Sequence, residues 1–581
     1  MLSRLSRRLV SSFQPTAQDN TSSIEIKNVA PPVLRRYSTS DPDGILEMIF
    51  AVCLVDFHHA RGPEVLWWRS NYIKDWTPDQ NLFRHLPFQA LPDGSHLFTE
   101  TFSNFNLVYD FRSGTSLDDK SDIDTFQGNP NHIETLFGCS CVRQIKTADM
   151  SQDEVARNKD ITRSIVQKAV VVIARKQPIF TKIKEKLSII TQTYFEQNDF
   201  NDYVLLDSLF ENLNRTFKLG DDESPRYEEQ EEYFVNLNLR GILFLFKNDM
   251  LVILKALLLE KKVMVYSNND LELLTQFQNN LIALIPNLLE NLDLCGCPLC
   301  DYTEKHSPLQ KPTSLKTNDR MSMLRFFGLP LQIFSTKGSF CNPYLPLQQI
   351  DELSAQSFMV GCSNLMIANK LMKYQIDLLV NLDDSTVLFP TGKGEDLKLS
   401  QMDKKFMSVL LSTTQNEDAY VGSDDYIRYQ FEDYVRSLLA TTKYYQYVEK
   451  FKNQPPGFDS AVDMNPGNLK SFGSAFAERW STTKNFEIWN ATCDDLIFNF
   501  HPPVHAAAEL SSGDPGYLSG LFSSFKKTKI PFKLSDKAVL YFSHQKKPQK
   551  FIPDKEQEPA KEAENEAKPE QKSYWNWDFK Q

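Results

Sequence analysis

An apolar run, ILEMIFAVCLVDF at residues 45–57, stands between two turn signals and constrains the fold more than any other stretch. Its β-branched and aromatic residues, with DPDG before it and ARGP after it, predict a buried strand. Gly62-Pro63 then predicts a turn into a second strand, EVLWW, which places His58 and His59 at the end of a hairpin. Two later runs, FNLVYDF (105–111) and TLFGCSCVRQI (135–145), have the same character. These strands predict a mainly antiparallel sheet.

From residue 160 onward the apolar pattern alternates between strand and helix periods. A strand is expected at 169–173. Two amphipathic helices follow it, with the apolar stripes Ile183, Leu187, Ile190, Tyr194 and Leu206, Leu209, Phe210, Leu213. A helix at 250–261 leads into the strand VMVYS, and a further apolar helix is expected at 271–289. Alternating helices and strands are typical of an α/β fold, which is the predicted fold class.

A polar gap at 301–320 separates this region from a third one, in which SFMVGCSNLMI and QIDLLVNLDDSTVLF predict short strands with a turn at Asp383 and Asp384. A long helix with one apolar face is expected at 424–444. The Lys/Glu/Pro-rich tail cannot bury enough apolar surface to fold. The predicted plan is a disordered leader (1–44), a first lobe (45–150), a central region (160–300), a downstream region (321–447), an extension (455–535) and a disordered charged tail (540–581).

Charge and cysteine content exclude several classes of protein. The 581-residue chain has a formal net charge of −11, whereas proteins that bind phosphate backbones carry a basic face, so no nucleic-acid partner is expected. Nine cysteines, sparse and odd in number, indicate a reducing compartment rather than a disulfide-stapled secreted fold. The best apolar stretch, MLVILKALLL (250–259), is interrupted by Lys255, so no membrane-spanning helix is expected.

The chain contains only incomplete versions of common catalytic motifs. FPTGKGED contains Gly392-Lys393, but Val387, two residues before this stretch, stands where a phosphate-binding loop needs its first glycine, and Gly394 stands where Ser or Thr should bind magnesium. GCSCV and GCSNL lack the closing glycine of a nucleophile elbow around Ser140 or Ser363. No histidine is followed by the H-E-x-x-H pattern. We therefore expect no catalytic residues and no cofactor.

One cluster is metal-like in composition: Cys295, Cys297, Cys300 and His306. A zinc site needs four such ligands around a tetrahedron, but paired C-x2-C spacing is absent. Free cysteines at a helix end are the preferred interpretation, and no metal is predicted. A metal-dependent hydrolase that recruits His58 or His59 remains an alternative. The preferred interpretation of that histidine pair is a turn, because neighbours on a strand point to opposite faces.

Two segments have membrane-like or targeting-like character. GYLSGLFSSFKKTK, Gly516 to Lys529, gathers the apolar residues Leu518, Leu521, Phe522 and Phe525 on one side, as in a helix that lies on a bilayer surface. A short helix that docks on the protein's own body is the alternative. The basic N-terminus MLSRLSRRLVSSF resembles a mitochondrial presequence, and a disordered or membrane-surface leader is the alternative.

Seven blocks of sequence occur in an order that resembles DENN-domain proteins, and most closely their AVL-nine-like late secretory pathway branch. The blocks are VDFHHARGPEVLWW, LPFQALPDGSH, TLFGCSCVRQI, DITRSIVQKAVVVI, LLLEKKVMVYS, STKGSFCNPYLPLQQID and SFMVGCSNLMI. The resemblance covers about residues 45–447.

The resemblance implies a tripartite DENN module, with a longin-like lobe at 45–150 and a larger α/β lobe after it. It implies binding of a Rab-type small GTPase and release of its GDP in late secretory transport, in the cytoplasm and peripherally on Golgi or secretory vesicle membranes. A GTPase effector or trafficking scaffold with the same fold is the alternative. Two blocks supply the candidate GTPase contacts, which are Leu91, Pro92, Asp93, Lys337 and Tyr344.

Overall fold

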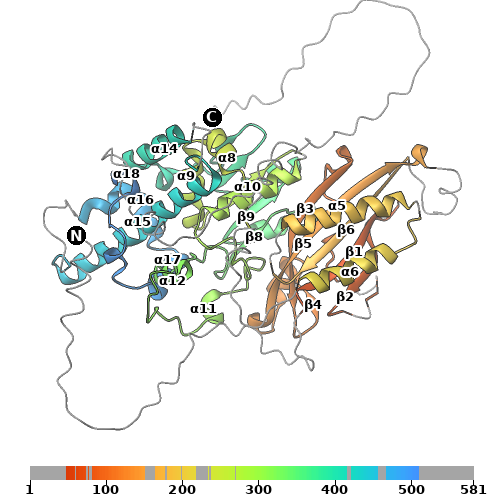
Figure 1. Ribbon diagram of the computed structural model, residues 1–581, viewed down its shortest axis with the longest axis horizontal. Coiled ribbons are helices and arrows are strands. Elements are labelled where there is room, and N and C mark those ends of the chain that lie inside the picture. Colours follow the sequence, from red (N-terminus) through yellow and green to blue (C-terminus); the bar gives the residue numbers. More distant parts are fainter. Residues whose placement is uncertain are drawn as a thin grey trace, which may run out of the picture. The chain divides into compact units, whose positions relative to one another are not determined.

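Two β-sheets and the helices around them organise the computed structural model (Figure 1). The structure describes residues 47–58, 60–73, 76–77, 82–150, 164–176, 180–197, 199–217, 233–234, 237–268, 270–414, 420–455 and 466–509. All of these residues belong to one compact unit of the chain. The expected leader (1–44), the charged tail (540–581) and the amphipathic segment with Leu518, Leu521, Phe522 and Phe525 lie outside the described residues.

The first sheet has six antiparallel strands in the order β2-β1-β6-β5-β3-β4. The strands are β1 (Ile49–His58), β2 (Gly62–Ser70), β3 (Glu100–Asp110), β4 (Thr115–Ser116), β5 (Ile133–Lys146) and β6 (Ile165–Ala174). The expected hairpin of β1 and β2 is confirmed, with His58 paired to Gly62. His58 closes the turn, because its Nδ1 accepts hydrogen bonds from the N–H groups of Ala60 and Arg61. His59 lies outside the described residues.

Strand β6 is the strand expected at 169–173, and it pairs between β1 and β5 at the centre of this sheet. Its side chains are buried on both faces, with Val170 and Val172 in one apolar cluster and Val171 and Ile173 in another. A strand that is apolar on both faces needs neighbours and cover on each side. Sequence pattern identifies such a strand but does not say which sheet it joins.

Helices cover both faces of the first sheet. On one face α5 (Phe180–Glu196) and α6 (Val204–Thr216) bury the two apolar stripes read from the sequence (Figure 1). On the other face lies the short helix α2 (Leu86–Ala90), which packs with Phe83 and Leu91 against the strands. A short helix, α3 (Lys120–Thr125), precedes β5. The region just after α2 reaches the second sheet.

The second sheet has five strands in the order β11-β10-β7-β9-β8. Its strands are β7 (Lys262–Tyr266), β8 (Ser339–Asn342), β9 (Ser357–Cys362), β10 (Leu378–Asn381) and β11 (Thr386–Leu388). Four are parallel and β11 is antiparallel to β10. The expected turn at Asp383 and Asp384 is confirmed, because Asn381 pairs with Thr386 across it. The mixed α/β class is therefore confirmed, while the tripartite and longin-like details stay predictions.

Helices surround the second sheet, and most of them pack in the main apolar cluster on one of its faces. Ile367 of α13 instead packs on the other face, and Tyr302 of α11 packs with Val108 and Ile133 of the first sheet. The helices are α8 (Leu239–Phe246), α9 (Asp249–Leu258), α10 (Leu271–Ala283), α11 (Tyr302–Lys305), α12 (Arg320–Phe326), α13 (Leu365–Ala368), α14 (Gln401–Thr413), α15 (Asp424–Phe451), α16 (Ser474–Trp480), α17 (Lys484–Thr492) and α18 (Ala506–Glu509). Helix α15 begins after Ser423, whose side chain accepts a hydrogen bond from the Tyr426 N–H. Among the described helices, none is long and apolar enough to cross a membrane.

The segment 466–509 is part of the main apolar core. Phe472, Phe476, Trp480 and Trp489 are buried in the same cluster as the helices α9, α14 and α15. The Trp489 indole donates a hydrogen bond to the carbonyl of Phe327, 3.0 Å away. The sequence predicted an extension from residue 455, and its described part completes the core of the second sheet's lobe.

Candidate functional site

A polar seam joins the two sheets along β3 and β8. The Asn106 side chain donates to the Cys341 carbonyl at 2.7 Å, and the Asn106 N–H donates to Oδ1 of Asn342 at 3.1 Å. The Gly296 N–H donates to the hydroxyl of Thr135 at 2.9 Å. A buried amide that loses its partner costs about 1–3 kcal/mol, so these bonds hold the sheets in one arrangement.

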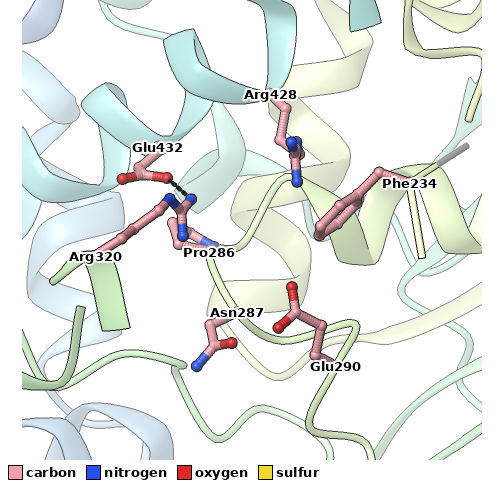
Figure 2. Close-up of a pocket in the computed structure, with 8 residues that line it drawn as sticks. Phe234, Pro286, Asn287, Glu290, Arg320, Arg428 and Glu432 are labelled. Atoms are coloured by element: carbon pink, nitrogen blue, oxygen red, sulfur yellow. Dashed lines mark hydrogen bonds and ion pairs between the residues drawn. The ribbon is translucent and has the colours of Figure 1, made fainter. Parts of the chain in front are cut away.

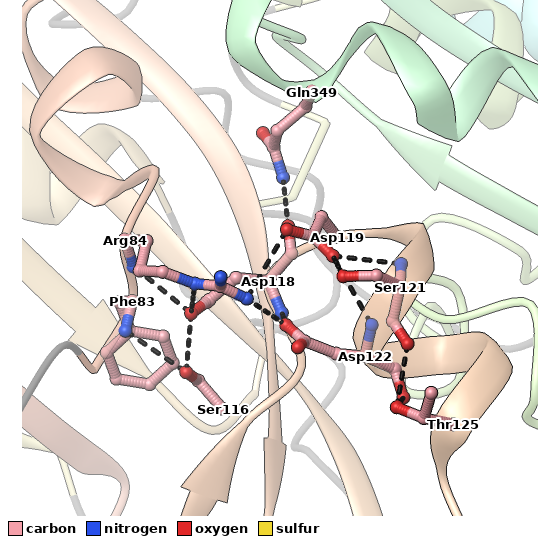
Figure 3. Close-up of polar contacts among 9 residues, drawn as sticks. All are labelled: Phe83, Arg84, Ser116, Asp118, Asp119, Ser121, Asp122, Thr125 and Gln349. Carbon is pink, nitrogen blue, oxygen red and sulfur yellow. Dashed lines mark hydrogen bonds and ion pairs between the residues drawn. The ribbon is translucent and has the colours of Figure 1, made fainter.

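A second set of contacts connects α2 to the 3₁₀ segment η5 (Leu347–Ser354). Gln89 is fully buried and donates to Oε1 of Gln349 at 2.9 Å. The Gln349 side chain in turn donates to the carbonyl of Asp118 at 3.2 Å (Figure 3). Each glutamine therefore bridges parts of the chain that lie far apart in the sequence.

An acidic cluster surrounds this bridge. Arg84 forms ion pairs with Asp118, Asp119 and Asp122, and its side chain points into the three carboxylates (Figure 3). Burial raises the pKa of Asp118. A single arginine thus faces three carboxylates at the edge of the junction.

The junction is expected to lose stability as pH rises, because of Glu352. Burial and the neighbouring carboxylates Asp119, Asp351 and Asp122 raise the pKa of Glu352 from its ordinary 4.5 to about 8, and Lys120 opposes this only weakly. Between these two values the folded chain holds more protons than the unfolded chain, so the free energy of unfolding falls as pH rises. A difference of one pKa unit corresponds to about 1.4 kcal/mol, and we expect a loss of about 2–4 kcal/mol from about pH 5 to about pH 8.

Urea denaturation at both pH values measures this loss. Glu352→Gln should remove most of the difference, whereas Glu395→Gln, at an exposed glutamate, serves as the matched control. An unchanged pH profile in the Glu352→Gln chain would show that other groups cause the dependence.

The turn after α2 forms the third contact between the sheets. Gly94 has φ of +84°, a conformation that glycine adopts without strain and that lets the chain reverse after Asp93. The Asp93 N–H donates to the hydroxyl of Tyr344 at 3.3 Å, and Asn364 donates to the Asp93 carboxylate at 2.7 Å. Burial raises the pKa of Tyr344, and the charge of Asp93 adds to the shift. The turn is therefore fixed to the second sheet.

Exposed apolar side chains flank this turn on both lobes. Leu97, four residues after Asp93, is 37% exposed, and Leu365 and Met366, directly after Asn364, are 42% and 56% exposed. We call Asp93, Leu97, Asn364, Leu365 and Met366 the junction surface. Exposed apolar residues rimmed by polar groups are typical of protein-binding sites. Because both lobes contribute, the surface depends on the seam that joins them.

The structure brings four of the five predicted GTPase contacts together. Leu91 and Pro92 are buried below the turn, and Tyr344 is buried beneath Asp93, so these three side chains position the surface. Lys337 lies elsewhere, because it precedes β8 whereas Tyr344 follows it. All five stay predictions as GTPase contacts. Sequence reasoning missed Leu97, Leu365 and Met366, since their apolar pattern is the same as that of core residues.

A narrow pocket lies beside α12 and α15 (Figure 2). Arg320 forms an ion pair with Glu432 at 2.5 Å, and the Arg428 guanidinium lies 3.6 Å from the centre of the Phe234 ring. Burial raises the pKa of Glu290 on the opposite wall. The cavity volume of about 10 Å³ is that of a single water, so this pocket is too small for a cofactor.

The cysteine cluster is buried without metal-site geometry. Cys295, Cys297 and Cys300 are fully buried, and a hydrogen bond links the last two. The His306 ring stacks on Tyr302 at 4.0 Å instead of facing the thiols. Among the residues that the structure describes, no group of three or more His, Cys, Asp or Glu could hold a metal ion. The geometry gives the metal-hydrolase alternative no support.

These features define a class of protein: a mixed α/β chain whose two sheets are held by a polar seam and expose apolar side chains from both lobes beside it. The sequence model of the family described as "Transport protein Avl9" matches residues 49–442. The chain belongs to this Avl9 family, and the expected AVL-nine-like membership is confirmed.

Two curated relatives extend the match. The "Late secretory pathway protein AVL9" of Saccharomyces cerevisiae is 40% identical over 477 residues, which cover 79% of this chain and 60% of that protein. The "Late secretory pathway protein avl9" of Schizosaccharomyces pombe is 33% identical over 484 residues, which cover 81% of this chain and 92% of that protein. The chain thus spans about 60% of the length of the S. cerevisiae relative.

Proposed function

We propose that this chain is a DENN-type regulator of a Rab-type small GTPase, and that it promotes GDP release in late secretory transport. The names of both relatives support the pathway. The junction surface carries the proposal of a protein partner, because it joins exposed apolar residues from two lobes at a rigid contact. We further propose that the protein acts in the cytoplasm, peripherally on Golgi or secretory vesicle membranes.

Nucleotide exchange fits a site without a nucleophile. A partner that binds the nucleotide-free GTPase more tightly than the GDP-bound form must weaken GDP binding by the same factor. To release GDP, the regulator holds the switch segments of the GTPase away from the phosphates and the magnesium ion that normally order them. Apolar side chains on a fixed frame, such as Leu365 and Met366 beside the Asp93–Asn364 bond, are suited to this task.

The test follows release of fluorescent GDP from a panel of exocytic and Golgi Rab GTPases with the full chain. One GTPase should respond, and the double substitution Leu365→Asp with Met366→Asp should slow its release by about tenfold or more, since buried charges at an interface centre are costly. Ile189→Asp is the matched control. Ile189 is 65% exposed on α5, on the face of the first sheet opposite to the Leu91–Asp93 turn.

Affinity for the nucleotide states separates the alternatives. An exchange factor must prefer the nucleotide-free GTPase, whereas an effector or scaffold must prefer the GTP form. Equal GDP release by the junction variant and the wild-type chain would remove the junction surface from the proposal. If the chain accelerates GDP release from no GTPase of the panel but captures a GTP-loaded Rab, the effector alternative is favoured.

A further inference from the structure

A second pocket, with a cavity volume of about 230 Å³, lies between the loop before β8 and the connection from α16 to α17. Nine of its ten lining residues are polar, and Leu259 is the exception. Six of the ten come from two blocks that lie far apart in the sequence, STKGSFCNPYLPLQ and FGSAFAERWSTTKNFEIW. The second block follows residue 442, where the family match ends.

Three cations from these two blocks converge on this pocket: Lys337 from the first, and Arg479 and Lys484 from the second. The single acidic group, Glu260, accepts hydrogen bonds from the backbone N–H of Lys484 at 3.3 Å and of Asn485 at 2.8 Å. This carboxylate therefore already compensates the N-terminus of α17. Three cations and one carboxylate leave a net charge of +2.

The three cations differ in how strongly other groups of the protein already bind them. The Lys484 ammonium donates to the carbonyl of Lys337, which holds it over the pocket. Lys337 lies 3.7 Å from Glu304, and both side chains are at least half exposed, so this ion pair is weak. The Arg479 carbonyl accepts hydrogen bonds from Thr482, but its exposed guanidinium forms no hydrogen bond or ion pair in the described part of the chain. Its fork of N–H donors is free to bind an oxyanion in two places at once.

The floor of the pocket is rigid and carries hydroxyl groups. Thr336 is 2% exposed and bonds to the hydroxyl of Ser339. Ser357 is 7% exposed and lines the same pocket. Gly338, with φ of +88°, lets the loop approach so closely that an added Cβ would lie 2.9 Å from the Gln356 side chain. The floor loop is therefore held in place before any ligand arrives, whereas the exposed cations above it can adjust to the ligand.

We propose that this pocket binds a phosphate monoester carried by a small polyol. A phosphate monoester bears about −1.5 to −2 charges at neutral pH and three acceptor oxygens, which matches the net charge and the donors. The volume is below the usual range of about 300–1,000 Å³ for drug-sized ligands, so a headgroup fits better than an extended molecule. The phosphate can come from an inositol lipid headgroup or from a soluble inositol phosphate.

The test uses the full chain and two probes. Calorimetry measures binding of inositol hexakisphosphate, and flotation measures binding to phosphatidylcholine vesicles with or without phosphatidylinositol phosphate. Arg479→Gln with Lys484→Gln should weaken binding by about tenfold or more, because it removes two charged donors that would form charge-assisted hydrogen bonds to the phosphate. Lys393→Gln is the matched control, since this exposed lysine belongs to the Gly-Lys-Gly sequence that only resembles a phosphate-binding loop. Thermal melts of each variant check that it is folded.

Each outcome decides the proposal. Loss of both binding modes in the double variant, with Lys393→Gln unchanged, supports the pocket and names the lipid as a source. Loss of soluble binding alone, without flotation of the wild-type chain, supports the pocket and a soluble phosphate ester. No binding by the folded wild-type chain, equal binding by the double variant, or binding only of a phosphorylated peptide overturns it.

Discussion

Replacing Asp403 with alanine is expected to lower the free energy of unfolding by about 3–5 kcal/mol, because it leaves a buried ammonium group unpaired. The Lys255 ammonium lies 2.5 Å from Oδ2 of Asp403, and both side chains are fully buried. Tyr434 donates to Oδ1 at 2.8 Å, and His505 lies 3.2 Å from the same oxygen. Four segments of the chain therefore meet at one carboxylate.

The surroundings of Asp403 favour the ionised form of its carboxyl group. Burial alone would raise the pKa of this carboxyl group, but the hydrogen bond from His505 and the charge of Lys255 outweigh burial and hold its pKa below the ordinary value. The Lys255 ammonium also donates to the carbonyl of Phe472 at 2.7 Å, which connects it to the segment after residue 466. Loss of the carboxylate thus affects the lysine, the tyrosine and the histidine together.

Chemical denaturation of the purified chain measures the effect. Glu395→Ala is the matched control, because Glu395 pairs with Lys398 at 2.5 Å on the surface, and its loss should cost only about 1 kcal/mol or less. Replacing both partners, Lys255→Met with Asp403→Leu, should recover much of the loss, since apolar replacement of a buried pair is often nearly neutral. A loss below about 1 kcal/mol in Asp403→Ala would mean that water or a rearranged neighbour compensates Lys255.

Lys255 also illustrates what the sequence can and cannot reveal. In MLVILKALLL it reads as a charge that interrupts an apolar run, and α9 does form there. Its partner lies 148 residues away, so no local pattern could identify the pair. Strands and helices such as β1, β9 and α15 were predictable, because alternation and helical spacing are local signals.

The junction surface was predictable only in part. The turn at Pro92 and Asp93 was singled out through a resemblance, and the structure fixes it by bonds to Tyr344 and Asn364. Leu365 and Met366 follow a buried strand and have the composition of core residues, so their exposure could not be predicted from the sequence. That contact rests on single amide bonds, such as the one from Asn106, which leave no periodic trace in the sequence.

A chain that ends at Pro455 is expected not to fold its second lobe, although the family match ends earlier, at residue 442. The truncation removes four large aromatic side chains from the main core: Phe472, Phe476, Trp480 and Trp489. Loss of one buried Phe or Trp side chain costs about 3–5 kcal/mol, and the whole stability of a domain is about 5–15 kcal/mol. The aromatic loss alone therefore exceeds what the lobe can tolerate.

Polar contacts strengthen this expectation, because the truncation also leaves buried groups without partners. The Leu258 carbonyl loses the side chain of Asn485 at 2.9 Å, and Lys255 loses the carbonyl of Phe472. The matched control is a chain that ends at Glu509, which keeps all of these contacts. Circular dichroism melts and limited proteolysis should find the longer chain cooperative and resistant, and the shorter chain non-cooperative and cleaved within the region 237–455. A shorter chain that melts cooperatively within a few degrees of the longer one would show that the core closes without α16 and α17.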